Sequence, residues 1–186
     1  MTKLDAINRL LRSVQAPDLT SLAEENLTYE QQLAKEIFED TNLLVQSLGW
    51  WFNTLEVTLK PDINGYISIP SNYLYVDPVD PTKNYIVMNG KLYNADKQTF
   101  DFSDENEVKV EVVLLLDFEK LPVPAQEYIT IKAEKEMQAK IFGSITDNSL
   151  PQRETEAYIA LIKQQNKAGD YNVLNHPQIQ EALRRW

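Results

Sequence analysis

The spacing of apolar residues predicts two helices within residues 1–50. In the first, apolar side chains recur every three or four positions, at Leu4, Ile7, Leu10, Leu11 and Val14. The second and longer helix has its apolar positions at Leu33, Ile37, Phe38, Leu44, Val45 and Leu48. Thr28 and Gln31 have the spacing of a capping box at the start of this helix. Gly49 is placed to end it in a left-handed conformation.

The middle of the chain changes to the two-residue alternation of β-strands. The predicted strands span residues 52–60, 66–69, 73–76, 85–88, 91–93, 99–102 and 108–116. The last of these is the longest and is expected to be central. Asn89-Gly90 lies between two of the strands and predicts a two-residue hairpin turn with positive φ at both positions.

Helical spacing returns near Pro124, where Ile129, Ala133 and Met137 step by four until Gly143 ends the run. A further helix is expected after Ser149, ending at Gly169, and the residues beyond it suggest an extended arm. These elements predict an α+β fold. An α-helical bundle comes from residues 1–50 and 123–169, an antiparallel β domain is inserted at residues 51–122, and a C-terminal arm covers residues 170–186.

Gly49, Trp50, Trp51 and Phe52 mark the junction between the second helix and the first strand. Large aromatic residues between two structural layers usually bury most of their area, so we expect these three to belong to the core. An exposed recognition patch is the alternative interpretation.

The composition is that of an ordinary globular protein with an acidic surface. The 186 residues include no cysteine, which excludes disulfides and thiolate chemistry. The net charge is −10, so tight non-specific binding to nucleic acid is not expected. No apolar run approaches the roughly 20 residues of a membrane span. The N-terminus resembles an amphipathic helix rather than a signal peptide.

A search for catalytic, metal and cofactor patterns finds none that is specific. The only histidine, His176, precedes a proline and has no partner for a metal site or a catalytic triad. The acidic cluster Asp101, Asp104, Glu105 and Glu107 lacks the glycine and the terminal glutamate of a calcium loop. No glycine-rich phosphate loop is present. Paired carboxylates form only in the tertiary structure, so a small hydrolase stays open as the least favoured alternative.

The end of the chain is basic and aromatic, unlike the rest. Tryptophan and arginine are the residues most enriched in interface hot spots, and tyrosine is enriched with them. We therefore expect the arm to contact a neighbouring subunit or partner through Tyr171, Ile179, Leu183, Arg184, Arg185 and Trp186. A frayed terminus is the other interpretation.

The order of several segments resembles the tail tubular protein A family, the head-to-tail adaptors of short-tailed, podovirus-type phages. Residues 48–53, Leu-Gly-Trp-Trp-Phe-Asn, are similar to the family's Gly-Trp-x-Phe-Asn signature. The other segments that carry the resemblance are residues 4–11, 18–22, 59–62, 69–74, 88–94, 100–102, 117–122 and 128–133.

The resemblance implies a helical bundle with an inserted β domain and no enzymatic activity, cofactor or metal. It implies a virion protein, made in the host cytoplasm, that forms a dodecameric ring beneath the portal. Such a ring extends the DNA channel and contacts the portal and a tail nozzle of the tail tubular protein B type. It often supports tail fibres. A host-binding or adhesion module of the tail is the second interpretation.

Overall fold

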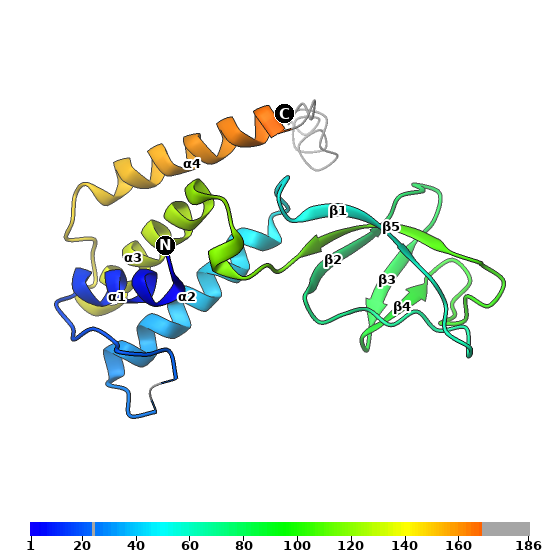
Figure 1. Ribbon diagram of the computed structural model, residues 1–186, viewed down its shortest axis with the longest axis horizontal. Coiled ribbons are helices and arrows are strands. Elements are labelled where there is room, and N and C mark those ends of the chain that lie inside the picture. The colour runs from blue at the N-terminus through cyan, green and yellow to red at the C-terminus, as the bar shows by residue number, and fades with distance from the viewer. Residues whose placement is uncertain (24, 169–186) are drawn as a thin grey trace. The chain divides into compact units, whose positions relative to one another are not determined.

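The computed structural model describes residues 1–23 and 25–168, and these residues confirm the α+β class (Figure 1). The chain separates into two compact units. Unit 1 contains Met1–Val45 and the residues from Asp117 onward, and unit 2 contains Gln46–Leu116. The boundaries between the units follow Val45 and Leu116. The boundaries expected from the sequence follow residues 50 and 122, a few residues later in each case.

Unit 1 begins with helix α1, Lys3–Ser13, which is started by a capping box. The Asp5 N–H donates to Thr2 Oγ1 over 3.1 Å, and the Thr2 N–H donates to Asp5 Oδ2 over 3.0 Å. These bonds satisfy N–H groups that have no partner within the first turn of the helix. The apolar face of α1 is fully buried at Ile7, Leu10 and Leu11.

Helix α2, Tyr29–Ser47, starts at the predicted capping box. The Thr28 N–H donates to Gln31 Oε1 over 2.9 Å, and the Gln31 N–H donates to Thr28 Oγ1 over 3.3 Å. The loop before α2 is held by the buried Asn8, which exchanges two hydrogen bonds with the backbone of Leu19. These two bonds hold Leu19 of the loop against α1.

The second half of unit 1 contains the 3-10 turn Phe118–Lys120, helix α3 (Val123–Phe142) and helix α4 (Leu150–Ala168). Helix α3 packs against both α1 and α4, although α1 is far from it in sequence (Figure 1). It ends at Gly143, as predicted, and the φ of this glycine is 73°, which is left-handed.

Unit 2 is built on a three-stranded antiparallel sheet in the order β1-β5-β2. The strands are β1 (Thr54–Leu59), β2 (Tyr73–Pro78) and β5 (Val108–Leu114). Strand β5 is central, as its length predicted. Its side chains at Val108, Val110 and Val112 enter the core of the unit.

A two-stranded sheet of β3 (Tyr85–Met88) and β4 (Lys91–Asn94) completes unit 2. Asn89 and Gly90 join these strands with φ angles of 52° and 68°. This is the geometry of a two-residue turn that follows the twist of the strands. Tyr85 and Leu92 of this sheet are buried in the same core as Phe102.

Two strands predicted from alternation are wrong. Residues 66–69 form a single bridge from Ser68 to Lys91, and residues 99–102 form a single bridge from Thr99 to Asn94. Pro70 has no N–H to extend the first pairing. In the second segment the Asp101 carboxylate accepts a hydrogen bond from the Ser103 N–H, which turns the chain away from β4. Ile67, Ile69 and Phe102 are buried, but the backbone does not continue as a ladder.

Candidate functional site

The helix-to-strand junction lies within unit 2. Gly49 has a φ of 73°, and a Cβ there would lie 3.3 Å from both Thr54 Oγ1 and Val113 Cγ2. Trp50 is buried, as expected. Trp51 and Phe52 are only half-buried, and their rings meet edge to face at 5.0 Å. The junction is therefore part core and part surface.

Asn53 is the fully buried centre of this junction. Its Oδ1 accepts from the Trp50 N–H over 2.8 Å, and its Nδ2 donates to the carbonyls of Gln46 and Leu114 over 2.9 and 2.8 Å. Gln46 in turn exchanges two side-chain hydrogen bonds with the backbone of Leu116. These two amides tie the first and last residues of unit 2 together. Sequence reasoning included Asn53 in a motif but did not predict this role.

A buried row of polar side chains runs along α3 in unit 1. We call it the polar stripe, and its members are four residues apart: Gln126, Thr130, Glu134 and Gln138. Gln126 Oε1 accepts from the N-terminal ammonium over 3.1 Å, and its Nε2 donates to the Phe118 and Leu121 carbonyls. The stripe thus orders the start of the chain against α3.

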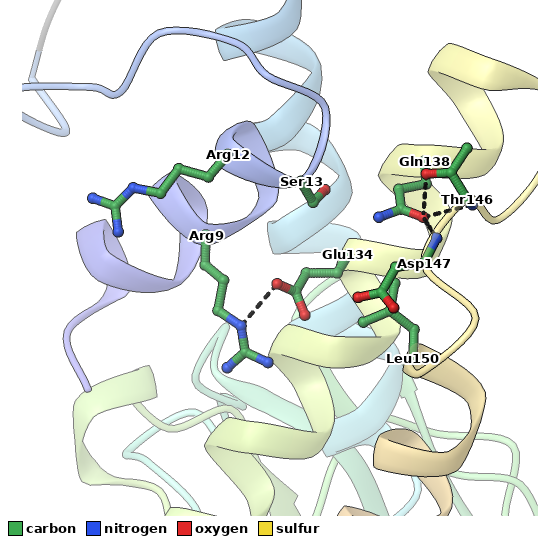
Figure 2. Close-up of a pocket in the computed structure, with 8 residues that line it drawn as sticks. All are labelled: Arg9, Arg12, Ser13, Glu134, Gln138, Thr146, Asp147 and Leu150. Atoms are coloured by element: carbon green, nitrogen blue, oxygen red, sulfur yellow. Dashed lines mark hydrogen bonds and ion pairs between the residues drawn. The ribbon is translucent and has the colours of Figure 1, made fainter.

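Arg9 of α1 reaches the polar stripe at Glu134 (Figure 2). Its Nε donates to Glu134 Oε1 over 2.8 Å, and its Nη1 donates to Glu127 Oε2 over 2.9 Å. Arg153 of α4 lies 3.6 Å from Glu127 Oε1 and 4.0 Å from Glu134 Oε2. Two arginines and two glutamates therefore connect α1, α3 and α4 in one network.

The pKa values of the two glutamates in the network are shifted in opposite directions. Burial raises the pKa of Glu134 above its ordinary value of 4.5, and the hydrogen bond and charge of Arg9 only partly offset it. Burial acts the same way on Glu127, but the hydrogen bond and charge of Arg9 outweigh it and lower its pKa. The pKa of Arg9 is raised because its bonds to both carboxylates exceed the effect of its own burial.

Arg9 and Glu134 of this network line an open pocket of about 380 Å³ (Figure 2). Its lining residues are Arg9, Arg12, Ser13, Glu134, Gln138, Thr146, Asp147 and Leu150. Gln138 Oε1 accepts hydrogen bonds from the Thr146 N–H over 2.9 Å and the Asp147 N–H over 3.1 Å. The last member of the polar stripe thereby fixes the loop that leads into α4.

Two acids with different titration behaviour share this pocket, which is the arrangement that a carboxylate hydrolase would need. Both acids already have structural partners. Glu134 pairs with Arg9, and the Asp147 carboxylate accepts the Ser149 N–H over 2.9 Å at the start of α4. That hydrogen bond, with the Ser149 side chain, lowers the pKa of Asp147. The arrangement can bind charge, but it does not hold two free acids across a cleft.

The remaining sequence-predicted residues do not gather at this pocket. Asn89 and Gly90 lie in unit 2, as do the acidic residues after Asp101, of which Asp104 pairs with Lys97 over 2.7 Å. Among residues 1–23 and 25–168, no three His, Cys, Asp or Glu side chains are placed to hold a metal ion. His176 and the expected partner-contact residues lie outside the described residues: Tyr171, Ile179, Leu183, Arg184, Arg185 and Trp186.

Sequence reasoning missed the pocket, although a signal was present. The polar stripe lies one position after the apolar row Ile129, Ala133 and Met137, and both rows are buried. A helix with a polar row beside its apolar row indicates that it is covered on two sides. The partner of Glu134, however, is 125 residues away in the sequence.

Comparison with known sequences identifies the family. A sequence model of the tail tubular proteins matches residues 4–171, which include nearly all of both units. The chain belongs to the tail tubular protein family. Tail tubular protein A of Klebsiella phage KP34 is 28% identical to it over 162 residues, which cover 87% of this chain and 85% of the relative.

As a tail tubular protein, the chain is a structural component of a bacteriophage virion, located in the tail. The described part of the chain has no helix that is both long and apolar enough to cross a membrane.

Proposed function

We propose that this tail tubular protein forms a ring, expected to be a dodecamer, that joins the phage portal to the tail nozzle. The ring extends the channel through which DNA leaves the capsid, and its outer face supports fibre attachment. No catalytic step is assigned to it. The proposal rests on membership of the family, on the two-unit architecture and on the exposed surface of unit 1.

The observation that carries the assembly is the apolar surface of the helices in unit 1. On α2, Leu43 and Leu44 are adjacent and 45% and 55% exposed. On α4, Tyr158 and Ile159 are adjacent and 43% and 45% exposed. Large apolar side chains that stay exposed on a helix are candidates for protein contacts. A ring subunit needs two different contact faces, and these helices supply candidates for both.

The charge of the chain agrees with a channel that does not retain DNA. With a net charge of −10, each subunit repels phosphates on average, and a ring multiplies this effect. DNA is therefore proposed to pass through without specific binding. A basic lining would hold it by counterion release.

The C-terminal arm, residues 170–186, is proposed to add a contact with a neighbouring subunit, the portal or the nozzle. Tyr171, Ile179, Leu183, Arg184, Arg185 and Trp186 are the residues assigned to it. Ordering such an arm costs conformational entropy, so the contact is expected to form on assembly.

A host-binding module is the second candidate, because unit 2 also exposes apolar side chains. Ile86, Val87 and Met88 of β3 are each a little over 40% exposed. They are aliphatic, but the unit also exposes the aromatic Tyr75 of β2, which is 50% exposed. The exposed Tyr66 of the same unit is covered on one face by Lys91, whose Nζ lies 4.0 Å from the ring centroid. The adaptor is favoured because two helices of unit 1 expose large apolar side chains, as a ring subunit with two contact faces requires.

Sedimentation velocity of the chain mixed with the portal protein of the same phage tests the proposal. The account predicts that the chain co-sediments with the portal at about one subunit per portal subunit and sediments slowly without it. A chain that stays monomeric at every ratio would contradict the adaptor and leave the host-binding module. Single substitutions Leu43→Asp and Ile159→Asp should each weaken co-sedimentation, while Ile63→Asp, a fully exposed position in unit 2, should not.

A further inference from the structure

The carboxylate of Glu134 is only half satisfied inside the pocket of unit 1. Its side chain is 6% exposed, and Oε1 accepts from Arg9 Nε. Its other oxygen, Oε2, is buried and has no hydrogen-bond donor among the described residues. The closest cationic nitrogen recorded for it, Arg153 Nη2, is at 4.0 Å, which is beyond hydrogen-bond distance. A buried carboxylate oxygen without a donor is costly, so this atom favours an incoming N–H group.

Asp147 brings a second carboxylate to the same pocket. In Figure 2 the carboxylates of Glu134 and Asp147 are directed toward the same space. Asp147 forms no ion pair with any residue of the described part of the chain. Leu150 also borders the pocket, but its side chain is fully buried. The pocket therefore offers two carboxylate acceptors to an incoming donor.

The balance of charge selects a cation. Arg9 and Arg153 are matched by Glu127 and Glu134. Arg12 is matched by Asp18 in a separate pair at the edge of the pocket. Asp147 has no ion-pair partner among the described residues, although the charge of Arg153 acts on it from a greater distance. A guanidinium presents several N–H donors in one plane and can bond two carboxylates at once, which an ammonium does less well.

We propose that this pocket receives the guanidinium of Arg184 or Arg185 from the C-terminal segment of a neighbouring copy of the chain. The sequence contains five arginines. Arg9, Arg12 and Arg153 already have carboxylate partners. The other two follow Leu183 and lie outside the described residues, and we assign the contact to them. This inference rests on the proposed ring, because it makes the pocket one side of a subunit contact.

The direction of α4 supports a neighbouring copy as the source. The pocket is at the first residue of α4, Leu150, and the C-terminal segment starts after its last, Ala168. A helix of 19 residues is about 28 Å long. The donor segment and the acceptor pocket thus leave opposite ends of one helix. This separation is consistent with a head-to-tail contact between neighbouring copies, which uses two different faces of each subunit.

The ligand chemistry is tested on the full-length chain carrying R184Q and R185Q, which removes its own arginines from competition. Butylguanidine and the neutral butylurea are titrated while the amide resonances of Thr146 and Asp147 are followed by NMR. We expect saturable shifts with butylguanidine alone. Adding E134Q or D147N should weaken binding at least about tenfold, the loss of one charged hydrogen bond. Adding E136Q, at an exposed position of α3, should leave it unchanged. Equal shifts with both compounds, or none with either, would overturn the proposal.

The source of the arginine is tested by disulfide trapping, because the natural chain has no cysteine. A tagged chain with Ser13→Cys at the pocket edge is mixed with an untagged chain with Trp186→Cys and assembled on the portal. Mild oxidation should give the tagged–untagged dimer. A tagged Ser103→Cys chain, exposed in unit 2, is the control and should give little of it.

The outcomes separate this inference from the proposed function. Assembly on the portal without the dimer, or with as much dimer from Ser103→Cys, would overturn the neighbouring copy as the source while the adaptor stands. Butylguanidine binding by a chain that never assembles would contradict the adaptor and support the chemistry of the pocket.

Discussion

Arg9 and Glu134 are 125 residues apart in the sequence, and their side chains meet at 2.8 Å between Nε and Oε1. The contact joins α1 to α3. In the sequence, all of unit 2 lies between these two helices. Ala6, Ile7 and Leu10 bury the apolar face of α1, but apolar contact alone does not select one rotation of a helix. A polar pair with two defined hydrogen-bond partners does.

Replacing Arg9 by methionine should destabilise unit 1. Glu134 would stay buried without its ion-pair partner, and breaking such a pair costs about 3 kcal/mol. Urea unfolding at neutral pH measures the change in the free energy of unfolding. Arg12→Met is the matched control, because its pair with Asp18 is exposed and should contribute little. Equal effects of the two substitutions would show that the network does not stabilise the fold.

The stability of E134Q and E127Q relative to the natural chain should change with pH in opposite directions. The folded-state pKa of Glu134 lies above 4.5, so its contribution is present below pH 4.5 and is lost as the pH rises through that pKa. Glutamine stays neutral, and E134Q should therefore gain relative stability over that interval. The folded-state pKa of Glu127 lies below 4.5, and its contribution is lost as the pH falls through that value.

E127Q should accordingly lose stability, relative to the natural chain, as the pH rises from the lowered pKa of Glu127 to 4.5. Urea midpoints of the three chains, taken from about pH 3.5 to about pH 7, give both slopes. If the relative stabilities of E134Q and E127Q changed with pH in the same direction, the pKa values of Glu134 and Glu127 would not be shifted in opposite directions.

Asn53→Asp should destabilise unit 2 by about 3 kcal/mol. The substitution places a carboxylate oxygen where Nδ2 now donates to the Gln46 and Leu114 carbonyls, so two donor–acceptor contacts become repulsive. Asn64→Asp, in an exposed turn of the same unit, should change stability by less than about 0.5 kcal/mol. Circular dichroism during urea unfolding compares the two. A loss of similar size at both positions would count against Asn53 as the centre of the junction.

Gly65→Ala should cost at least twice as much stability as Gly90→Ala. Both glycines have positive φ, but a Cβ at Gly90 would meet nothing within 4 Å. A Cβ at Gly65 would meet Asp101 Oδ1, which already accepts the Ser103 N–H. The backbone cost at Gly90 alone is about 1 kcal/mol. Thermal unfolding ranks the variants, and a reversed order would mean that the turn at Asp101 moves without cost.

Local signals predicted the secondary structure well, because each one depends on neighbouring residues. Thr28 and Gln31 bond each other as a capping box, and Gly49 has the predicted left-handed conformation. Alternation was less reliable, since residues 66–69 and 99–102 alternate and yet form single bridges. A buried side chain on every second residue requires an extended backbone but not a paired one.

The pocket depended on contacts that no local pattern contains. In the sequence Glu134 is one of several charged residues on a predicted helix, and its partner, Arg9, lies near the start of the chain. Asn53 was likewise part of a recognised segment, but its bonds to Gln46 and Leu114 follow from the way β1 meets β5. The assignments to Tyr171 and the residues after it remain predictions.

Electron microscopy of the purified chain, alone and mixed with the portal, tests the central claim most directly. The account predicts rings of twelvefold symmetry that cap the portal and continue its channel, and no such rings without the portal. A chain that never appears on the portal at micromolar concentration would contradict the adaptor.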